Sequence, residues 1–179
     1  MVFIFKKMNK QEKKIFKIFT RYLAIIIIGL GNFYILYKIL TPLTIHVTNL
    51  ILNIFTPTSL TGSIIHTKNA TIEIASSCIA ASAFFLLIVL IFSILDIKPK
   101  TRIYAALTAT AILFLFNIAR ILFLIPFIGK PYFETLHWIL WHMVSIVFVL
   151  VAYFITIKIY KIKSIPIYSD FRYIKSLIK

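Results

Sequence analysis

The sequence contains few acidic residues, few glycines and a single cysteine. Five Asp and Glu residues stand against 20 Lys and Arg, which gives a net charge of +15. With only Cys78 present, an internal disulfide is excluded, so this thiol is either a small buried apolar group or a reactive one. Only four glycines occur among 179 residues, whereas 61% of the residues are hydrophobic. A soluble domain of this size cannot bury so much apolar surface, so a soluble globular protein is excluded.

Long apolar segments dominate the chain instead. Four of them approach or exceed the roughly 20 residues needed to cross a bilayer, and they cover about 22–40, 76–95, 103–125 and 135–157. A shorter apolar segment, 42–59, is bounded by Pro42 and Pro57 and is predicted to form an interfacial or re-entrant helix. The sequence therefore predicts an all-α polytopic membrane protein with about four transmembrane helices and this additional helix.

A small exterior β-hairpin is predicted just before the second span. Polar and apolar residues alternate over 71–75, which is the periodicity of a strand. Lys68 and Asn69 precede this stretch and are typical of a turn between two strands.

Positive charge is concentrated at the ends of the spans. The segments 1–21, 96–102 and 158–179 carry 16 of the 20 Lys and Arg residues, and the segments on the other side carry three. The positive-inside rule then places both termini in the cytoplasm. We expect one membrane domain over 1–179, with basic cytoplasmic tails at 1–21 and 158–179 and a membrane core at 22–157. Basic residues arranged as flanks of spans argue against nucleic-acid binding, because they face the anionic cytoplasmic leaflet.

Three polar residues, Cys78, Arg120 and His142, lie on three different predicted spans. Cys78 begins the second span at its exterior end. Arg120 lies about five residues before the exterior end of the third span, roughly 7 Å deep, and His142 lies about seven residues into the fourth, roughly 10 Å deep. The predicted topology therefore brings a thiol, a cation and an imidazole to one depth near the exterior face, as a candidate nucleophilic site.

Each of these residues also has a purely structural interpretation. A lone cysteine or histidine in an apolar helix is more often a packing or hydrogen-bonded residue, and an arginine this close to the interface can reach it by snorkelling. Arg120 is the hardest to explain in that way, because an intramembrane cation needs a partner. Asn117, three residues earlier on the same helical face, can hold it, and a Cys78 thiolate would be its counter-ion. His142 is preferred to His137, which is expected to belong to an interfacial aromatic belt.

The order of these residues resembles that of the exosortase/archaeosortase family, which are integral membrane cysteine transpeptidases, and the composition suggests an archaeal-type member. The resemblance covers about 20–157, and its motifs here are Ser77-Cys78-Ile79-Ala80, Asn117-Ile118-Ala119-Arg120-Ile121 and Trp141-His142-Met143-Val144-Ser145. The family commonly has Cys-Ser-Gly at the first of these, so the small residues after the nucleophile differ.

The resemblance implies a membrane cysteine protease or transpeptidase that cleaves the C-terminal sorting signal of surface proteins and transfers them to a lipid or another acceptor, at a plasma-membrane site facing the exterior. It implies Cys78 as the nucleophile that forms a thioester, His142 as the proton carrier and Arg120 as the stabilising cation, with Asn117 in support. It implies no cofactor and no metal. An intramembrane protease that releases its substrate stays open as an alternative. So does a transporter component or assembly factor that binds an anionic substrate through Arg120, although the apolar inner halves of the spans offer no continuous polar path.

Overall fold

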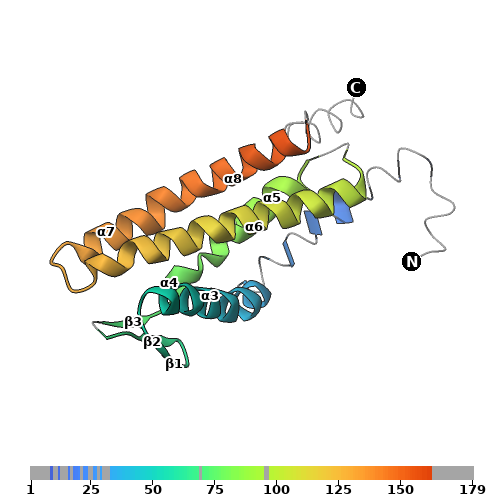
Figure 1. Ribbon diagram of the computed structural model, residues 1–179. Helices are drawn as coiled ribbons and strands as arrows, with labels where there is room; N and C mark the ends of the chain where they lie inside the picture. Colours follow the sequence, from blue (N-terminus) through green and yellow to red (C-terminus); the bar gives the residue numbers. More distant parts are fainter. Residues whose placement is uncertain are drawn as a thin grey trace.

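A computed structural model describes residues 9, 12, 16, 18–20, 22–23, 26–27, 29, 33–68, 70–94 and 97–162. Most of the two predicted basic tails lies outside these residues. The elements follow in the order α3 (Tyr34–Phe55), β1 (Ser59–Thr61), β2 (Ile64–His66), β3 (Thr71–Glu73), α4 (Ser76–Ile79), α5 (Ala81–Phe92), α6 (Pro99–Leu124), the 3-10 turn η1 (Ile125–Phe127), α7 (Phe133–Ile139), the π-helical segment η2 (Leu140–Val144) and α8 (Ser145–Ile159) (Figure 1).

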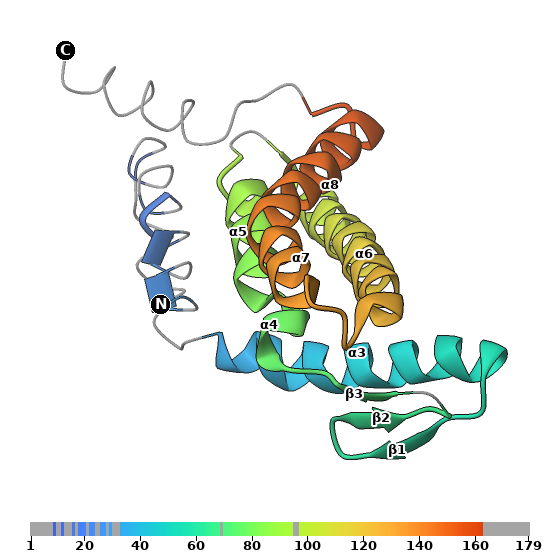
Figure 2. The ribbon, with the colours of Figure 1, turned by 90° about the vertical axis from the view of Figure 1, so that its left-hand side faces the viewer.

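Three helical rods form the bundle. Helices α5, α6 and α8 pack against one another, with α7 continuing the line of α8 (Figures 1 and 2). Helices α6 and α8 are antiparallel, and the hydroxyls of Thr108 and Tyr160 share a hydrogen bond of 2.9 Å near one end. Ala105, Ala109 and Ala152 are fully buried, so small side chains allow the backbones to approach closely, as in membrane helix packing.

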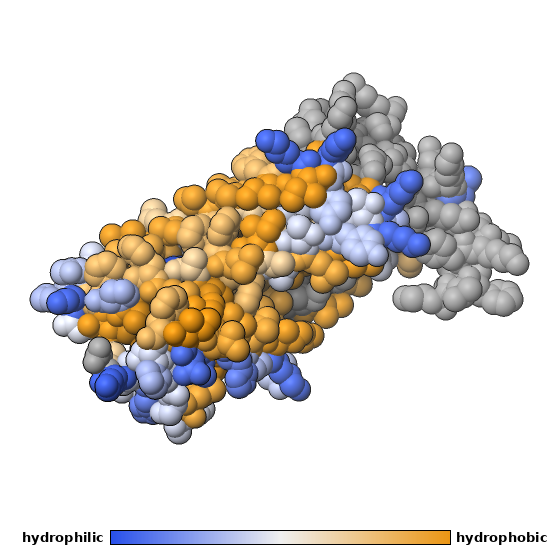
Figure 3. Space-filling model, in the orientation of Figure 1, coloured by the Kyte–Doolittle hydropathy of each residue, from blue (hydrophilic) through white to orange (hydrophobic). Residues whose placement is uncertain are grey.

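The outside of the bundle is apolar, as a lipid-facing surface requires. Figure 3 shows hydrophobic surface along the middle of the bundle and hydrophilic residues at its two ends. Among the described residues, three helical stretches are long and apolar enough to cross a membrane: α3, α6 with η1, and α7 through α8. Helices α4 and α5 together form a shorter apolar stretch, Ser76–Phe92. The prediction of a polytopic all-α membrane protein is confirmed.

Helix α3 crosses one end of the bundle instead of running along it (Figure 2). Its buried residues, Leu40, Thr44, Ile45 and Thr48, recur at helical spacing and form one face. That face packs against α4, α5 and α6. The additional helix predicted after the first span is therefore present, and it lies at the end of the bundle that carries the β-sheet.

The boundaries predicted for this helix were wrong. Helix α3 runs unbroken through Pro42, although a proline inside a helix removes one backbone hydrogen bond and costs roughly 3 kcal/mol. Packing of the buried face offsets this loss, because tertiary contacts supply most of the stability of a helix. The break falls at Phe33, whose φ of 56° is left-handed. The end of the predicted first span, from Tyr34, thus belongs to α3.

The predicted hairpin is present and has a third strand. Strand β2 pairs antiparallel with both β1 and β3, in the order β1-β2-β3. Ile65 lies opposite Ile72 in the β2–β3 pair, and both are buried, so one face of the sheet joins the core. The turn between β2 and β3 is tied by hydrogen bonds between Thr67 and Ala70.

The predicted second span, 76–95, is not one continuous helix. It begins with the single turn α4, changes direction at Ala80, whose φ is 54°, and resumes as the 12 residues of α5. Twelve residues rise only about 18 Å, which is less than the thickness of a bilayer core. Cys78 therefore lies on a separate turn of helix between the sheet and the bundle.

Candidate active site

The short helix α4 is held by side chains from α6. The last carbonyls of a helix lack intrahelical donors, and here the Cys78 carbonyl accepts a hydrogen bond of 2.8 Å from Nδ2 of Asn117. Nη2 of Arg120 donates to the same carbonyl at 3.2 Å and to the Ser77 carbonyl at 3.3 Å. Asn117 and Arg120 therefore fix the backbone that carries the Cys78 thiol.

Arg120 also connects α6 to α8. Its Nη1 donates to Oγ of Ser145 at 2.9 Å, and the side chain is only 4% exposed. A buried guanidinium needs several acceptors, and these are neutral oxygens from two other helices. Its Nε is buried without a hydrogen-bond partner among the described residues.

His142 lies within the π-helical segment η2. Its Nδ1 is 3.1 Å from the carbonyl oxygen of Trp138. Because a carbonyl only accepts, the proton in this bond belongs to Nδ1, and Nε2 keeps a free lone pair. The rings of Trp138 and Trp141 lie 4.7 and 4.3 Å from the imidazole, measured between ring centroids. His142 is thus held in the tautomer that a general base requires.

A cavity of about 410 Å³ adjoins α4 and is walled by β3, α6, η1 and α7. Its polar lining includes Cys78, Arg120, Glu73, Glu134 and His137, and much of the remainder is apolar. His142 is not among the lining residues, whereas His137 is. The cavity therefore combines the only thiol of the chain with a buried cation, an imidazole and two carboxylates.

The structure brings together three of the four site residues expected from the sequence. Cys78, Asn117 and Arg120 are in direct contact through the Cys78 carbonyl. His142 lies three residues before Ser145, the acceptor of Arg120, and hence at the same end of the bundle. Its role stays a prediction.

Sequence reasoning did not find the two carboxylates of the cavity, and it assigned His137 to an interfacial belt. One signal was available, because Glu134 and His137 are three residues apart and therefore share a helix face. Acidic residues are scarce in this chain, and this scarcity is a second signal that distinguishes Glu134.

Ala80 occupies the position at which the resembled family carries glycine. Its left-handed backbone, φ 54° and ψ 36°, costs an L-residue about 1–2 kcal/mol. The left-handed conformation of Ala80 changes the direction of the chain and so separates α4 from α5. Glycine adopts this left-handed backbone without strain, so the chain differs from the family's Cys-Ser-Gly at the position where glycine fits best.

We expect Ala80→Gly to raise the free energy of unfolding by up to about 1 kcal/mol, since relief of the strain exceeds the roughly 0.4–1 kcal/mol of extra unfolded-state entropy. Ala81, the next residue, is buried and is the first residue of α5, so Ala81→Gly should lower the free energy of unfolding by roughly 0.5–1 kcal/mol. Thermal unfolding of the purified protein in detergent measures both. Equal destabilisation by the two substitutions would show that Ala80 is not strained.

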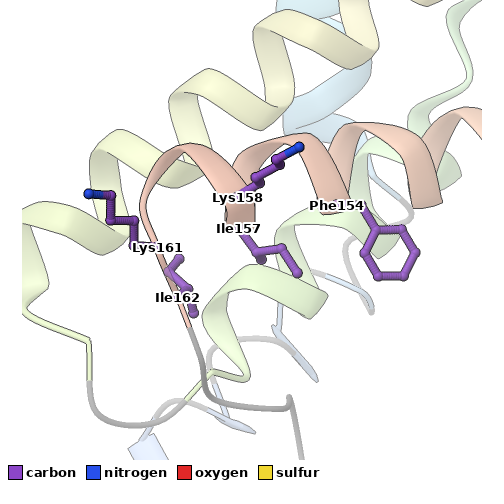
Figure 4. A pocket seen from close by; sticks show the side chains of 5 residues that line it. All are labelled: Phe154, Ile157, Lys158, Lys161 and Ile162. Carbon is purple, nitrogen blue, oxygen red and sulfur yellow. The ribbon is translucent and has the colours of Figure 1, made fainter.

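A second hollow lies at the other end of the bundle. It has a volume of about 500 Å³ and is lined by Phe154, Ile157, Lys158, Lys161 and Ile162 (Figure 4). It contains no nucleophile and no acid–base group other than lysine. Among the described residues, no three His, Cys, Asp or Glu side chains are grouped so that they could hold a metal ion.

The chain was compared with known proteins. The family model described as transmembrane exosortase matches residues 11–157. This match covers α3 through most of α8 and includes every residue of the cavity and its supports. No curated protein and no solved structure matches the chain.

Proposed function

The chain belongs to the transmembrane exosortase family, and we propose on that premise that Cys78 is the nucleophile of a membrane cysteine transpeptidase. Members of this family act as membrane proteases or transpeptidases on C-terminal sorting signals. The observation that carries the proposal is the placement of Cys78 on the wall of a cavity that Arg120 also lines, with the guanidinium bonded to the Cys78 carbonyl. The thiolate is the nucleophilic form of cysteine.

The reaction begins at the peptide bond that precedes the membrane span of a surface protein. The Cys78 sulfur attacks the carbonyl carbon, and the bond to the amide nitrogen breaks, leaving a thioester on the enzyme. The departing fragment is the C-terminal span with a new amino terminus. An acceptor then attacks the thioester carbonyl and releases Cys78. The acceptor is a membrane lipid or another nucleophile.

His142 transfers the proton in the first step. Its Nδ1 is engaged with the Trp138 carbonyl, so Nε2 takes the thiol proton and returns it to the departing amine. Arg120, which lines the same cavity as Cys78, stabilises the thiolate and then the negative oxygen of the tetrahedral intermediate. Asn117 positions Cys78 through its carbonyl.

A transporter or assembly factor that binds an anion through Arg120 fits these contacts less well. Both terminal nitrogens of the guanidinium already have acceptors within the protein, Ser145 Oγ and the carbonyls of α4. The guanidinium has five N–H donors, so Nε and one hydrogen of Nη1 are left, but the side chain is only 4% exposed and an incoming anion has little access to them.

The proposed activity can be tested by comparing the C-termini of surface proteins between host cells that contain this gene and host cells that lack it. We expect a group of surface proteins to keep a C-terminal membrane span only in cells that lack it, as mass spectrometry of their C-terminal peptides would show. Identical C-termini in both strains would refute the proposed function.

The proposed orientation has both termini in the cytoplasm and the cavity on the exterior side. Lys98 precedes α6 and Lys130 follows η1, so the two residues mark opposite ends of one helix. In a Cys78→Ser background, which has no other cysteine, we expect Lys130→Cys to react with a membrane-impermeant maleimide on intact cells. Lys98→Cys should react only after permeabilisation. The reverse pattern would invert the topology and put the cavity inside.

A further inference from the structure

Strand β3 is an edge of the three-stranded sheet. In the order β1-β2-β3 its backbone pairs with β2 on one side, and on its other side the described residues supply no strand. Figure 2 shows β3 as the strand of the sheet that lies nearest to the helical bundle. An edge strand carries a row of backbone N–H and C=O groups that are free to pair with another extended chain.

The free edge of β3 faces the cavity that contains Cys78. Five consecutive residues, 71–75, line this cavity together with residues of α6, η1 and α7, whereas none of the described residues of β1 or β2 does. Strand β3 leads directly into α4, and Cys78 follows the last residue of β3, Glu73, by five residues. The unpaired edge and the nucleophile are therefore parts of one wall of the cavity.

The register of the sheet shows which backbone groups point to the free edge. The amide of Ile74 donates to the carbonyl of Ser63, on the β2 side, at 3.0 Å. The backbone groups of successive residues in an antiparallel ladder point alternately to the two sides of a strand. Ile72, two residues before Ile74, therefore also directs its N–H and C=O to β2. The intervening residues, Thr71 and Glu73, direct theirs to the free edge.

We propose that the substrate binds as an additional β-strand along the free edge of β3. The occupant is the extended segment next to the cleaved bond of a surface protein, and its backbone pairs with that of Thr71 and Glu73. The proposal rests on the proposed function, because it concerns how the same site holds its substrate.

The chemistry of the substrate explains why a strand edge is needed here. The cleaved bond adjoins a membrane span, and a helix engages its carbonyls in intrahelical hydrogen bonds. The segment at this bond must therefore leave the helical state before the Cys78 sulfur can reach a carbonyl carbon. Its N–H and C=O groups then lose their partners, which is costly next to lipid. The edge of β3 supplies new partners beside the nucleophile.

Selectivity comes from the other wall of the cavity. When a peptide adds to a sheet edge, main-chain hydrogen bonds give affinity and pockets for alternate side chains give specificity. Successive side chains of a strand project to opposite faces, so only every second side chain of the substrate segment can enter the apolar part of the cavity. This part is formed by the α6 and η1 end of the bundle and includes Ile121, Leu124, Ile125 and Ile128.

The first test changes the substrate and leaves the protein unaltered. The full chain in phospholipid vesicles cleaves a synthetic peptide that carries the span of one precursor accumulating in cells without the gene, with the segment before that span. In a series of such peptides a single backbone amide of the segment is N-methylated, which removes its N–H. We expect KM to rise roughly tenfold at every second position and to change little at the positions between, because only alternate amides of a paired strand point to the neighbouring strand.

The second test removes a donor from the edge itself. Proline is tolerated at the first residue of a strand, so Thr71→Pro removes an N–H of the free edge without removing a bond to β2. Thr71→Ala loses the same side chain and keeps the N–H. We expect KM of Thr71→Pro to exceed that of Thr71→Ala by about 2- to 10-fold. The two kcat values should be similar, since this pairing binds the substrate and its transition state equally.

Strand β1 offers a matched control at the opposite edge of the sheet. Leu60 lies opposite Ile65, and the backbone groups of Ile65 point to its partner in β3, Ile72. The N–H of Leu60 therefore points to the outer edge, away from the cavity. Leu60→Pro should keep the KM of the unaltered chain at matched protein amounts.

The outcomes separate the two proposals. Equal effects of methylation at neighbouring positions would overturn the pairing with β3 and leave the proposed function intact. Equal KM values for Thr71→Pro and Thr71→Ala, or an equal rise in Leu60→Pro, would do the same. Failure of the unaltered protein to cleave the unmethylated peptide, or cleavage that persists in Cys78→Ala, would instead refute the proposed function.

Discussion

Replacing Cys78 with alanine should leave an abundant, inserted protein that processes no substrate. The thiol is half-buried on a single turn of helix, and the contacts that hold this turn are made to its backbone carbonyls. Removing the sulfur therefore removes little packing, and the bonds from Asn117 and Arg120 remain. Without the nucleophile no thioester can form.

The loss should be visible in the substrates. Surface proteins should retain the C-terminal span and tail, which adds about 2–3 kDa for a span of roughly 20 residues and a short tail. Mass spectrometry of intact surface proteins in cells expressing Cys78→Ala provides the measurement. Cys78→Ser should behave in the same way, since a hydroxyl is a far weaker nucleophile in a site built for a thiolate. Normal processing by Cys78→Ala would end the transpeptidase interpretation.

Arg120→Lys should abolish processing almost as completely, by about 10²–10³-fold, the range found when one oxyanion donor is removed. Lysine keeps the charge, but its single nitrogen cannot replace a planar group that reaches Ser145 on α8 and two carbonyls of α4 at the same time. The Ser77 carbonyl would lose its donor from Arg120, whereas the Cys78 carbonyl keeps the one from Asn117, and an unsatisfied buried polar group costs about 1–3 kcal/mol. The thermal midpoint should therefore fall as well.

Arg102→Lys is the matched control. Arg102 also donates to a backbone carbonyl, from Nη2 to Ile94 at 2.7 Å, but it lies at the opposite end of α6. Processing by Arg102→Lys should equal that of the unaltered chain once protein amounts are matched. A fully active Arg120→Lys would remove Arg120 from the mechanism, because a snorkelling residue tolerates this exchange.

The parts of the fold that the bilayer dictates could be predicted from the sequence. The lengths of the apolar segments locate the helices. Lipid offers no hydrogen-bond partner to exposed backbone groups, so a segment that crosses it must form its own backbone hydrogen bonds. The proximity of Cys78, Asn117 and Arg120 was expected, because an intramembrane cation must find partners and the charge pattern placed those residues near one depth. The bonds themselves differ from the expectation: Asn117 and Arg120 both donate to the Cys78 carbonyl, whereas Asn117 was expected to hold the guanidinium and the thiolate to be its counter-ion. The alternation over 71–75 likewise indicated β3.

The parts that depend on tertiary packing were not predictable. The residues around Pro42 do not show whether this proline ends a helix or lies inside it. Pro42 lies inside α3, and the packing of the buried face of α3 decides between the two. Phe33 and Ala80 have left-handed backbone conformations, but neither is a glycine, so the sequence does not indicate these two turns. The π-helical turn η2 alters the helical phase between His137 and His142, so regular α-helical spacing does not predict which imidazole lines the cavity.

The position of Arg120 along α6 has a consequence for substrate choice. Arg120 lies 21 residues after Pro99, the first residue of the helix, which is about 31 Å at 1.5 Å per residue. This equals the thickness of a bilayer core, roughly 30 Å. A substrate span lying alongside α6 with its basic tail at the level of Pro99 therefore presents its far end to Cys78. We therefore expect the precursors that accumulate with Cys78→Ala to share a narrow range of span lengths, because only a span of matching length would reach Cys78 from this position.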